Sequence, residues 1–237
     1  MTILKFVFLL TFTFGTAFSQ ISGEATYRVA MSDLRKVDNA PIEMNQLADE
    51  IKSRTESKVY ILEFNGNQSH FFEKKMMNSE ATQNKMMDGI ASIIGGDTNY
   101  YDREKKISIK ENIQGILIKD DHPKKDWVIS TETKVIDNYT CYKAEFTETY
   151  LTFSGVKTKI IVAWFAPSLP YTYGPRGYNG LPGLILELVD SERKVALHMT
   201  NLKIKKEPTI IKFPTGKTIT SEEYIKTISS EMPYMKK

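Results

Sequence analysis

The residue types that most often carry chemistry are few in this chain. It contains three histidines. His70 and His198 lie in alternating, strand-like segments, where a hydrogen-bonded histidine within a sheet is expected. His122 lies in the polar segment DDHPKK, which is typical of a solvated turn. Neither H-E-x-x-H nor a zinc-type cysteine and histidine spacing occurs, so we expect no metal site of that kind.

Sequence patterns typical of catalysis are also missing. The nucleophile motif G-x-S-x-G does not occur. Glu222 and Glu223 form a carboxylate pair, but they are better explained as acidic residues in the first turn of a helix. Cys141 is the only cysteine, and it is expected to be a small buried residue rather than a nucleophile. We therefore predict no catalytic residues, no cofactor and no enzymatic activity.

The methionine pairs Met76–Met77 and Met86–Met87 could do a different kind of chemistry. On one continuous helix, the spacing between Met76 and Met87 would place the pairs on a shared face. Thioether sulfur atoms bind Cu(I), so one interpretation is periplasmic copper handling. The alternative is that these methionines fill a core or line an apolar groove, and this alternative is favoured.

A glycine-rich segment, GPRGYNGLPGLI, precedes the most apolar strand-like segment, LILELV. Its glycines, at 174, 177, 180 and 183, do not have the spacing of a dinucleotide-binding loop, and a strand follows rather than a helix. The segment PTGKT resembles the end of a phosphate-binding loop, but Ile211 occupies the position of the required first glycine. We therefore expect no nucleotide to bind.

The same segment is well explained as a turn. Pro182 and Gly183 suit the central positions of a type II turn, with Gly183 at positive φ. Such a turn would deliver the chain into a strand with Leu184, Leu186 and Leu188 on one face. Ile185, Glu187 and Val189 would lie on the other face, so the strand is expected to be covered on both sides.

The loop before this strand is the best candidate for a binding site in the sequence. Aromatic side chains and an arginine on a rigid loop are typical anchors for a partner or a ligand. The alternative is a rigid structural connection with incidental aromatic residues. The residues predicted to bind are Trp164, Tyr173, Arg176, Tyr178, Leu181, Pro182 and Gly183.

Hydrophobic periodicity predicts the elements that must position these residues. Residues 24–31 alternate as a half-buried strand, and residues 41–55 and 79–94 follow the pattern of amphipathic helices. Asn65-Gly66 predicts a tight hairpin with positive φ angles. Ser221 is expected to open a short C-terminal helix.

Strands follow strands with few helices between them, which favours sequential antiparallel pairing. The predicted fold class is α+β, a curved and mainly antiparallel β-sheet with two or three helices packed on one face. The length after residue 19 suits one domain, so residues 20–237 are expected to form a single domain.

The N-terminal segment is typical of a secretory signal peptide. Lys5 precedes an apolar run from Phe6 to Phe14, and Ala17 and Ser19 are the small residues of a cleavage site. The run is shorter than the about 20 residues that span a bilayer. We predict export, to the periplasm or the cell surface, with cleavage after Ser19. The formal charge of +3 comes from interspersed acidic and basic residues, which gives no basic stripe for nucleic acid.

The segment GLPGLILEL resembles the signature of the GLPGLI family of exported proteins in Bacteroidetes. The segment WVISTETKVIDNYTCYKA, which includes Cys141, Lys143 and Ala144, is similar to the upstream block of that family. The segment AWFAPSLPYTYGPRGYNGLPGLILEL is similar to the downstream block. The resemblance implies export and a role in the cell envelope, but no established activity, cofactor or catalytic residue.

The expected function is therefore that of an exported, non-enzymatic cell-envelope module. It would bind an outer-membrane or other envelope protein, or an apolar, lipid-like ligand in the groove of a curved sheet. It is not expected to span the membrane. Copper handling by the methionine pairs is the alternative function.

Overall fold

The computed structural model describes residues 22–32, 42–75, 85–120, 125–152 and 155–231. Their dominant feature is one twelve-stranded sheet with the order β12-β6-β5-β4-β3-β2-β1-β11-β10-β9-β8-β7. The strands are β1 (Ser22–Met31), β2 (Val59–Phe64), β3 (Gln68–Glu73), β4 (Thr98–Asp102), β5 (Ile107–Glu111), β6 (Leu117–Asp120), β7 (Val128–Ile136), β8 (Tyr139–Thr152), β9 (Gly155–Ala166), β10 (Leu184–Asp190), β11 (Val195–Lys205) and β12 (Thr218–Ile219).

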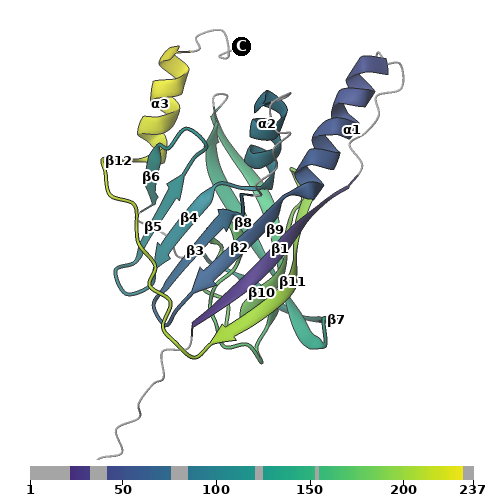
Figure 1. Cartoon of the computed structure of the whole chain (residues 1–237), viewed down its shortest axis with the longest axis vertical. Helices are drawn as coiled ribbons and strands as arrows, with labels where there is room; N and C mark the ends of the chain where they lie inside the picture. The colour runs from purple at the N-terminus through teal and green to yellow at the C-terminus, as the bar shows by residue number, and fades with distance from the viewer. Residues whose placement is uncertain (1–21, 33–41, 76–84, 121–124, 153–154, 232–237) are drawn as a thin grey trace, which may run out of the picture.

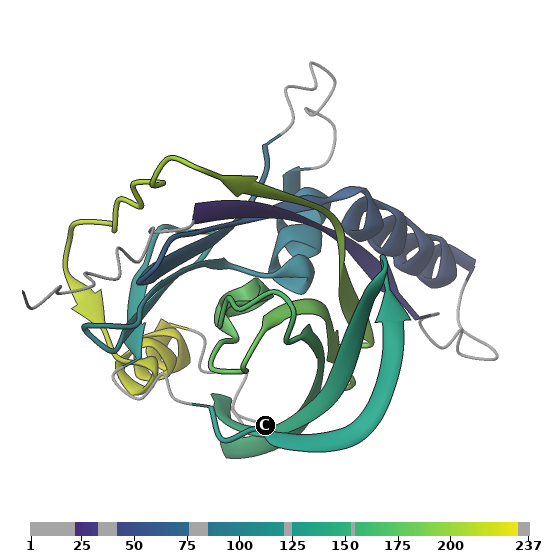
Figure 2. The same cartoon turned by 90° about the horizontal axis from the view of Figure 1, so that it is seen from below.

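The sheet consists of two antiparallel meanders joined at its centre. The first arm runs from β1 outward to β6, and the second runs from β11 outward to β7. The arms meet where β1 pairs with β11 along their whole length, from Ser22 opposite Lys205 to Met31 opposite Val195. Among the strands that the structure describes, only the short pairing of β12 with β6 is parallel. The two arms curl toward each other, and residues 167–183 lie inside the curl (Figure 2).

The prediction that the helices form a layer on one face of the sheet is wrong. The described helices are α1 (Ile42–Ser57), α2 (Lys85–Gly95) and α3 (Ser221–Glu231), and they gather at one end of the sheet (Figure 1). The chain is still α+β, but the sheet is much larger than expected. The physical reason is that the inner face is covered by the other arm and by the loop that follows β9, so no helical layer packs there.

Most of the individual elements predicted from periodicity do form. The helix predicted over 41–55 is confirmed as α1, and α2 occupies the described part of the helix predicted over 79–94. The apolar face of α1 is not buried as amphipathicity suggested, because Met44 is 60% exposed and Leu47 is 41% exposed. α1 is attached to α2 by an ion pair of 2.9 Å between Arg54 and Asp88.

The hairpin at Asn65-Gly66 forms between β2 and β3, but by a different mechanism from the one predicted. Neither residue adopts a positive φ angle. Instead, the side-chain oxygen of Asn65 accepts hydrogen bonds from the backbone N–H groups of Asn67 at 2.9 Å and Gln68 at 2.8 Å. This is the local capping that asparagine supplies in turns.

The core joins both arms to the loop inside the curl. The rings of Tyr60 and Phe71 stack at 5.2 Å in the first arm. The Tyr27 hydroxyl on β1 donates a 2.6 Å hydrogen bond to the Ile185 carbonyl on β10. Leu181 and Tyr173 of the loop are almost fully buried in the same cluster. The loop is therefore part of the core and not an external connection.

Gly183 does not occupy the positive-φ position of a type II turn, so that prediction is wrong. A β-carbon at Gly183 would instead lie 2.3 Å from the backbone oxygen of Ala166. Glycine is required here because the loop passes directly against the end of β9. The tight contact therefore excludes every side chain at this position, whereas a positive φ angle would only disfavour most of them.

The faces of β10 also differ from the predicted alternation. The pairing of β10 with β9 is irregular between Ile185 and Glu187. Ile185 lies opposite Phe165, and Leu188 lies opposite Ala163, so Ile185 and Leu188 share the inner face. The irregularity inserts an extra residue, which moves Leu184 to the other face.

Candidate functional site

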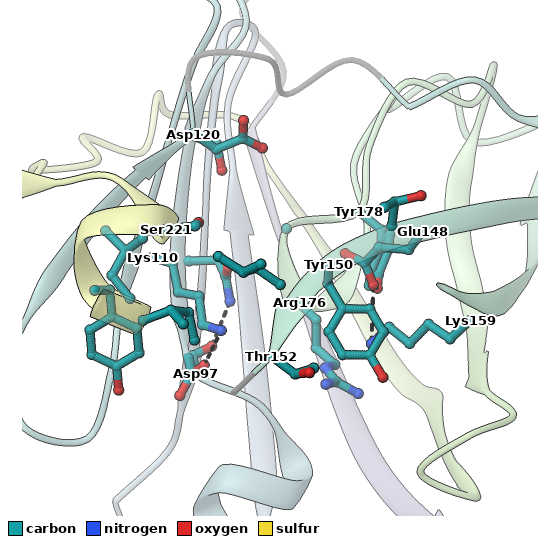
Figure 3. A pocket seen from close by; sticks show the side chains of 18 of the residues that line it. Asp97, Lys110, Asp120, Glu148, Tyr150, Thr152, Lys159, Arg176, Tyr178 and Ser221 are labelled. Atoms are coloured by element: carbon teal, nitrogen blue, oxygen red, sulfur yellow. Dashed lines mark hydrogen bonds and ion pairs between the residues drawn. The ribbon is translucent and has the colours of Figure 1, made fainter. Parts of the chain in front are cut away.

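A cavity of about 890 Å³ opens between the two arms of the sheet (Figure 3). One wall comes from β5 and β6 of the first arm and from the start of α3. The opposite wall comes from β8 and β9, and the 3-10 turn η1 (Pro175–Gly177) closes the space between them. Elements distant in sequence therefore build one site, as is usual for ligand pockets.

The turn η1 holds Arg176 in an uncommon backbone conformation. Arg176 has φ 57° and ψ 27°, which lie in the left-handed region that residues other than glycine and asparagine rarely adopt. The turn packs tightly against the end of α2, since a β-carbon on Gly96 would lie 2.9 Å from Cγ of Arg176. Strain of about 1–3 kcal/mol at such a residue persists only where the surroundings enforce it, and it is often found at functional sites.

A cluster of buried charges forms the wall beside Arg176. Lys159 on β9 donates to Asp190 at 2.9 Å and contacts Glu148 on β8 at 3.0 Å. Its side chain is only 8% exposed, and that of Asp190 is 1% exposed. The Tyr178 hydroxyl donates a 2.7 Å hydrogen bond to Glu148. These contacts fix the relative positions of β8, β9 and the loop.

Both carboxylates of this cluster are held in the ionised form. Burial alone would raise the pKa of Asp190, but the hydrogen bonds from Lys159 and from the Arg193 backbone hold it below its usual value. Burial likewise opposes ionisation of Glu148, and Lys159 and Tyr178 more than offset it, so its pKa is also lowered. Neither group is therefore poised to act as a general acid near neutral pH.

Arg176 is the member of the cluster with the poorest set of partners. Its nearest carboxylate oxygen, on Asp190, lies 3.6 Å from Nη1, which is an ion-pair distance but too long for a hydrogen bond. Burial, and then repulsion from Arg193, lowers the pKa of Arg176. In the described part of the chain, the buried side-chain atoms without a hydrogen-bond partner are Tyr60 Oη, His70 Nε2 and Arg176 Nη1. Arg176 is the one among these three residues that lines the cavity.

The opposite wall carries paired charges. Lys110 on β5 forms a 2.7 Å ion pair with Asp97, and the two side chains face the Arg176 cluster across the cavity (Figure 3). Ser221 and Tyr224 of α3 complete this side. The Tyr224 hydroxyl accepts a 3.0 Å hydrogen bond from Asn112, which attaches α3 to the end of β5.

The structure divides the predicted binding residues among four environments. Arg176 and Tyr178 line the cavity. Tyr173, Leu181 and Gly183 are buried in the core, and Pro182 is exposed. Trp164 lies on the face of β9 opposite to Lys159, beneath the ammonium group of Lys134 at 4.3 Å. The seven residues therefore do not form one surface.

Sequence reasoning missed Glu148, Lys159 and Asp190. The alternating pattern of β9 did contain a signal for Lys159. The inward positions of this strand are Ile161, Ala163 and Phe165, and the same period of two reaches Lys159. A charged residue in phase with a buried face is uncommon and indicates a buried pair or a site. Nothing in the sequence, however, indicated that Asp190 would meet it.

The other residues singled out from the sequence lie away from the cavity. Cys141 is buried, and its burial raises the pKa of the thiol to about 11. His198 contacts Glu187 at 3.1 Å, and His70 stacks between Phe72 and Tyr100. His122 lies outside the described residues, as do Met76 and Met77. Met86 is 66% exposed, whereas its neighbour Met87 is buried.

Two other kinds of site are absent from the described ranges. No group of three or more histidine, cysteine, aspartate or glutamate side chains there is arranged to hold a metal ion. None of the helices that the structure describes combines the length and the apolar character needed to cross a lipid bilayer.

Comparison with protein families gives one match. Residues 151–187 match a family described as a protein of unknown function, Porph_ging. This segment contains the end of β8, all of β9, η1 and the GLPGLI sequence, but it is less than half of the chain. The family name expected from the sequence is not confirmed by this match. No curated protein shows significant sequence similarity to the chain.

Comparison with solved structures extends over most of the fold. The structure of PNGF-II in space group C2 aligns with 88% of this chain at 17% sequence identity, with a TM-score of 0.50. The structure of PNGF-II in space group P21 aligns similarly, with a TM-score of 0.49. This chain spans 32% of the length of the first of these structures. At this identity the similarity concerns the fold alone.

Proposed function

We propose that this protein is an exported, non-enzymatic binding module that holds a small polar ligand in the cavity between the arms of its sheet. The observation that carries the proposal is the cavity itself, whose walls combine charged and apolar side chains from both arms, from η1 and from α3. Its volume of about 890 Å³ lies within the range of small-molecule sites, about 300–1,000 Å³.

The lining favours a polar ligand over the lipid-like ligand expected from the sequence. An apolar molecule in this cavity would remove Lys159, Arg176 and Glu148 from water without supplying hydrogen bonds, which is costly. A ligand with hydroxyl or charged groups could satisfy them. Polar side chains already held by ion pairs also need little reorganisation on binding.

Binding is favoured over catalysis because of the state of the charged groups. Glu148 and Asp190 both have lowered pKa values and share Lys159. A hydrolytic site commonly contains one protonated and one ionised carboxyl group, or a nucleophile beside a base. The pair of Glu148 and Asp190 does not have either arrangement, which supports a role in holding a ligand over a role in transforming it.

Export is supported by the N-terminal sequence. The positively charged residue, the short apolar run and the small residues before Gln20 form the three parts of a signal peptide. N-terminal sequencing of protein secreted by its native host should therefore begin at Gln20. Detection of an intact Met1 in the mature protein would contradict export.

The binding proposal can be tested by filling the cavity. Ser108 on β5 lines it, so Ser108→Trp should occupy part of its volume. Thr131 on β7 is exposed and does not line it, so Thr131→Trp is a matched control. Native mass spectrometry of protein purified from its host should show a small polar molecule bound to the wild type and to Thr131→Trp. Its equal retention by Ser108→Trp, or a bound lipid, would contradict the proposal.

A further inference from the structure

The charges beside Arg176 do not balance. Lys159, Arg176 and Arg193 lie within ion-pair distance of Asp190, at 2.9, 3.6 and 3.8 Å. Glu148 is the second carboxylate of this cluster, through Lys159. Three positive groups therefore share two negative ones, which leaves one positive charge without a carboxylate of its own.

The geometry locates that excess charge at Arg176. Lys159 has close contacts with both carboxylates. Arg193 has further partners, since its side chain donates to the Ile93 carbonyl at the end of α2, and it is partly exposed to solvent. Arg176 has only the long contact with Asp190, and its side chain is 10% exposed. A guanidinium group so placed lacks both water and a hydrogen-bonding anion.

The fold also prevents Arg176 from moving to a better partner. Its backbone is fixed at positive φ between Pro175 and Gly177. The stem of its side chain lies against Gly96, with no room for even a methyl group between them. The guanidinium group is therefore held in the cavity wall with Nη1 itself buried, and the small exposed part of its side chain is what a molecule in the cavity can reach.

We infer that the ligand of this cavity carries a carboxylate group, which binds the exposed part of the Arg176 guanidinium group and supplies the negative charge that the cluster lacks. This inference rests on the proposed function and specifies its ligand. A carboxylate fits because it brings a single negative charge and the planar pair of oxygens that a guanidinium group binds best. A phosphate monoester would bring about −1.5 to −2 charges, which exceeds the deficit.

The rest of the cavity indicates that the carboxylate belongs to a polar molecule. Beyond Arg176, the lining includes Ser108 of β5 and Ser221 of α3, whose side chains carry hydroxyl groups. Hydroxyl groups on a ligand could exchange hydrogen bonds with them. The class we assign is therefore an organic carboxylate that also bears hydroxyl groups.

Two sugars test the inference on the wild-type protein, because they differ at one carbon. D-Glucuronate carries a carboxylate where D-glucose carries a hydroxymethyl group. Isothermal titration at neutral pH and matched ionic strength should show glucuronate binding at least about tenfold more tightly than glucose, since a charge-assisted hydrogen bond contributes about 1.5–3 kcal/mol. Acetate should compete with glucuronate, and glucose 6-phosphate should bind more weakly than glucuronate.

Variants then assign the effect to Arg176. Arg176→Gln should reduce glucuronate affinity to that of glucose, while Arg28→Gln, which removes an exposed arginine from β1, should leave it unchanged. If Arg176→Gln does not fold, Gly96→Ala provides a second test, because the added methyl group displaces the Arg176 stem. Gly115→Ala is its control, since Gly115 also has positive φ but faces open space.

The outcomes separate the two proposals. Equal binding of glucose and glucuronate, abolished by Ser108→Trp, would overturn the carboxylate inference and leave the binding function standing. Tighter binding of glucose 6-phosphate would overturn the choice of carboxylate in the same way. Failure of every probe would overturn the inference, and the absence of any bound molecule in the native protein would then also overturn the proposed function.

Discussion

At the scale of single residues, the loop before β10 shows two ways in which a fold constrains one side chain. Gly183 is excluded from bearing a β-carbon by the backbone of Ala166, and Arg176 is constrained by a left-handed backbone and by Gly96. Arg176 was expected on an exposed binding loop, but it lies inside the curl of the sheet. Its removal is therefore expected to affect the packing of the protein interior.

The basis of the requirement for glycine at 183 can be tested with asparagine. Asparagine tolerates positive φ but has a β-carbon. Gly183→Asn should therefore destabilise the protein by about 1–3 kcal/mol or more through overlap with Ala166. Gly180 in the same loop has φ +92° and open space around it, so Gly180→Asn should be nearly neutral. Urea unfolding measures both, and equal effects of the two variants would contradict the close-contact explanation.

His70 predicts a pH dependence of stability. Burial between Phe72 and Tyr100 lowers its pKa from 6.5 to about 4. His70 therefore takes up a proton at a higher pH in the unfolded chain than in the folded chain. The stability that the neutral, buried His70 contributes is fully present above pH 6.5 and is lost as the pH falls toward 4. The His70→Phe variant should keep the ring stacking. As the pH is lowered over that interval, its free energy of unfolding should fall less than that of the wild type, as measured by urea unfolding at several pH values. If the free energy of unfolding changed with pH in the same way in the variant and the wild type, His70 would not be the group that causes the pH dependence.

At the scale of elements, α3 is the helix whose position matters most to the cavity. It contributes Ser221 and Tyr224 to the lining and contacts the first arm through Asn112. The sequence correctly predicted that α3 starts at Ser221, but the side chain that caps the helix belongs to Thr220. The Thr220 hydroxyl accepts from the Glu223 backbone at 3.1 Å, and Glu223 accepts from the Thr220 backbone at 2.8 Å. This reciprocal pair is a capping box.

Loss of this capping box should loosen α3 without unfolding the sheet. Thr220→Ala is expected to cost about 1 kcal/mol of helix stability. Hydrogen exchange of the α3 backbone amides should then accelerate about fivefold, while exchange in β1 and β11 stays unchanged. Ser230→Ala, at the other end of the helix, is the control. Unchanged exchange in Thr220→Ala would show that contacts with the sheet alone hold the helix.

At the scale of the whole molecule, the pairing of β1 with β11 joins the two arms, and a shared core extends across them. The Trp127 indole on the second arm donates a 2.9 Å hydrogen bond to the Asn179 carbonyl in the loop. The Tyr173 hydroxyl connects the same loop to the hairpin of the first arm at Gly66. Because the loop contacts both arms, separate unfolding of one arm would disrupt the core of the other.

The predicted single domain should therefore unfold in one transition. The chain has two tryptophans, and they report on different places. Trp127 lies near Tyr178 inside the curl, whereas Trp164 lies on the other face of β9. Single-tryptophan variants, Trp127→Phe and Trp164→Phe, should each show a fluorescence midpoint that coincides with the midpoint of their circular dichroism. Distinct midpoints within one variant would divide the chain into two folding units.

The sequence by itself determined the local structure of this protein. Period-two and helical patterns located α1, the described part of α2, the hairpin of β2 with β3, and the start of α3. These elements depend on neighbouring residues, whose spacing is visible in one segment. The signal peptide and the absence of common catalytic motifs are likewise local, and they stand as predictions because they depend on the same kind of pattern.

The tertiary structure alone decided how those elements are arranged and where the candidate site lies. The pairing of Ser22 with Lys205 joins the two arms at the centre of the sheet, and no local pattern records a contact between residues so distant in the sequence. Lys159, Asp190 and Arg176 come from three different elements, and each by itself resembles an ordinary surface charge. Only the curl of the sheet removes them from water together, and this burial turns three ordinary side chains into a site with an unbalanced charge.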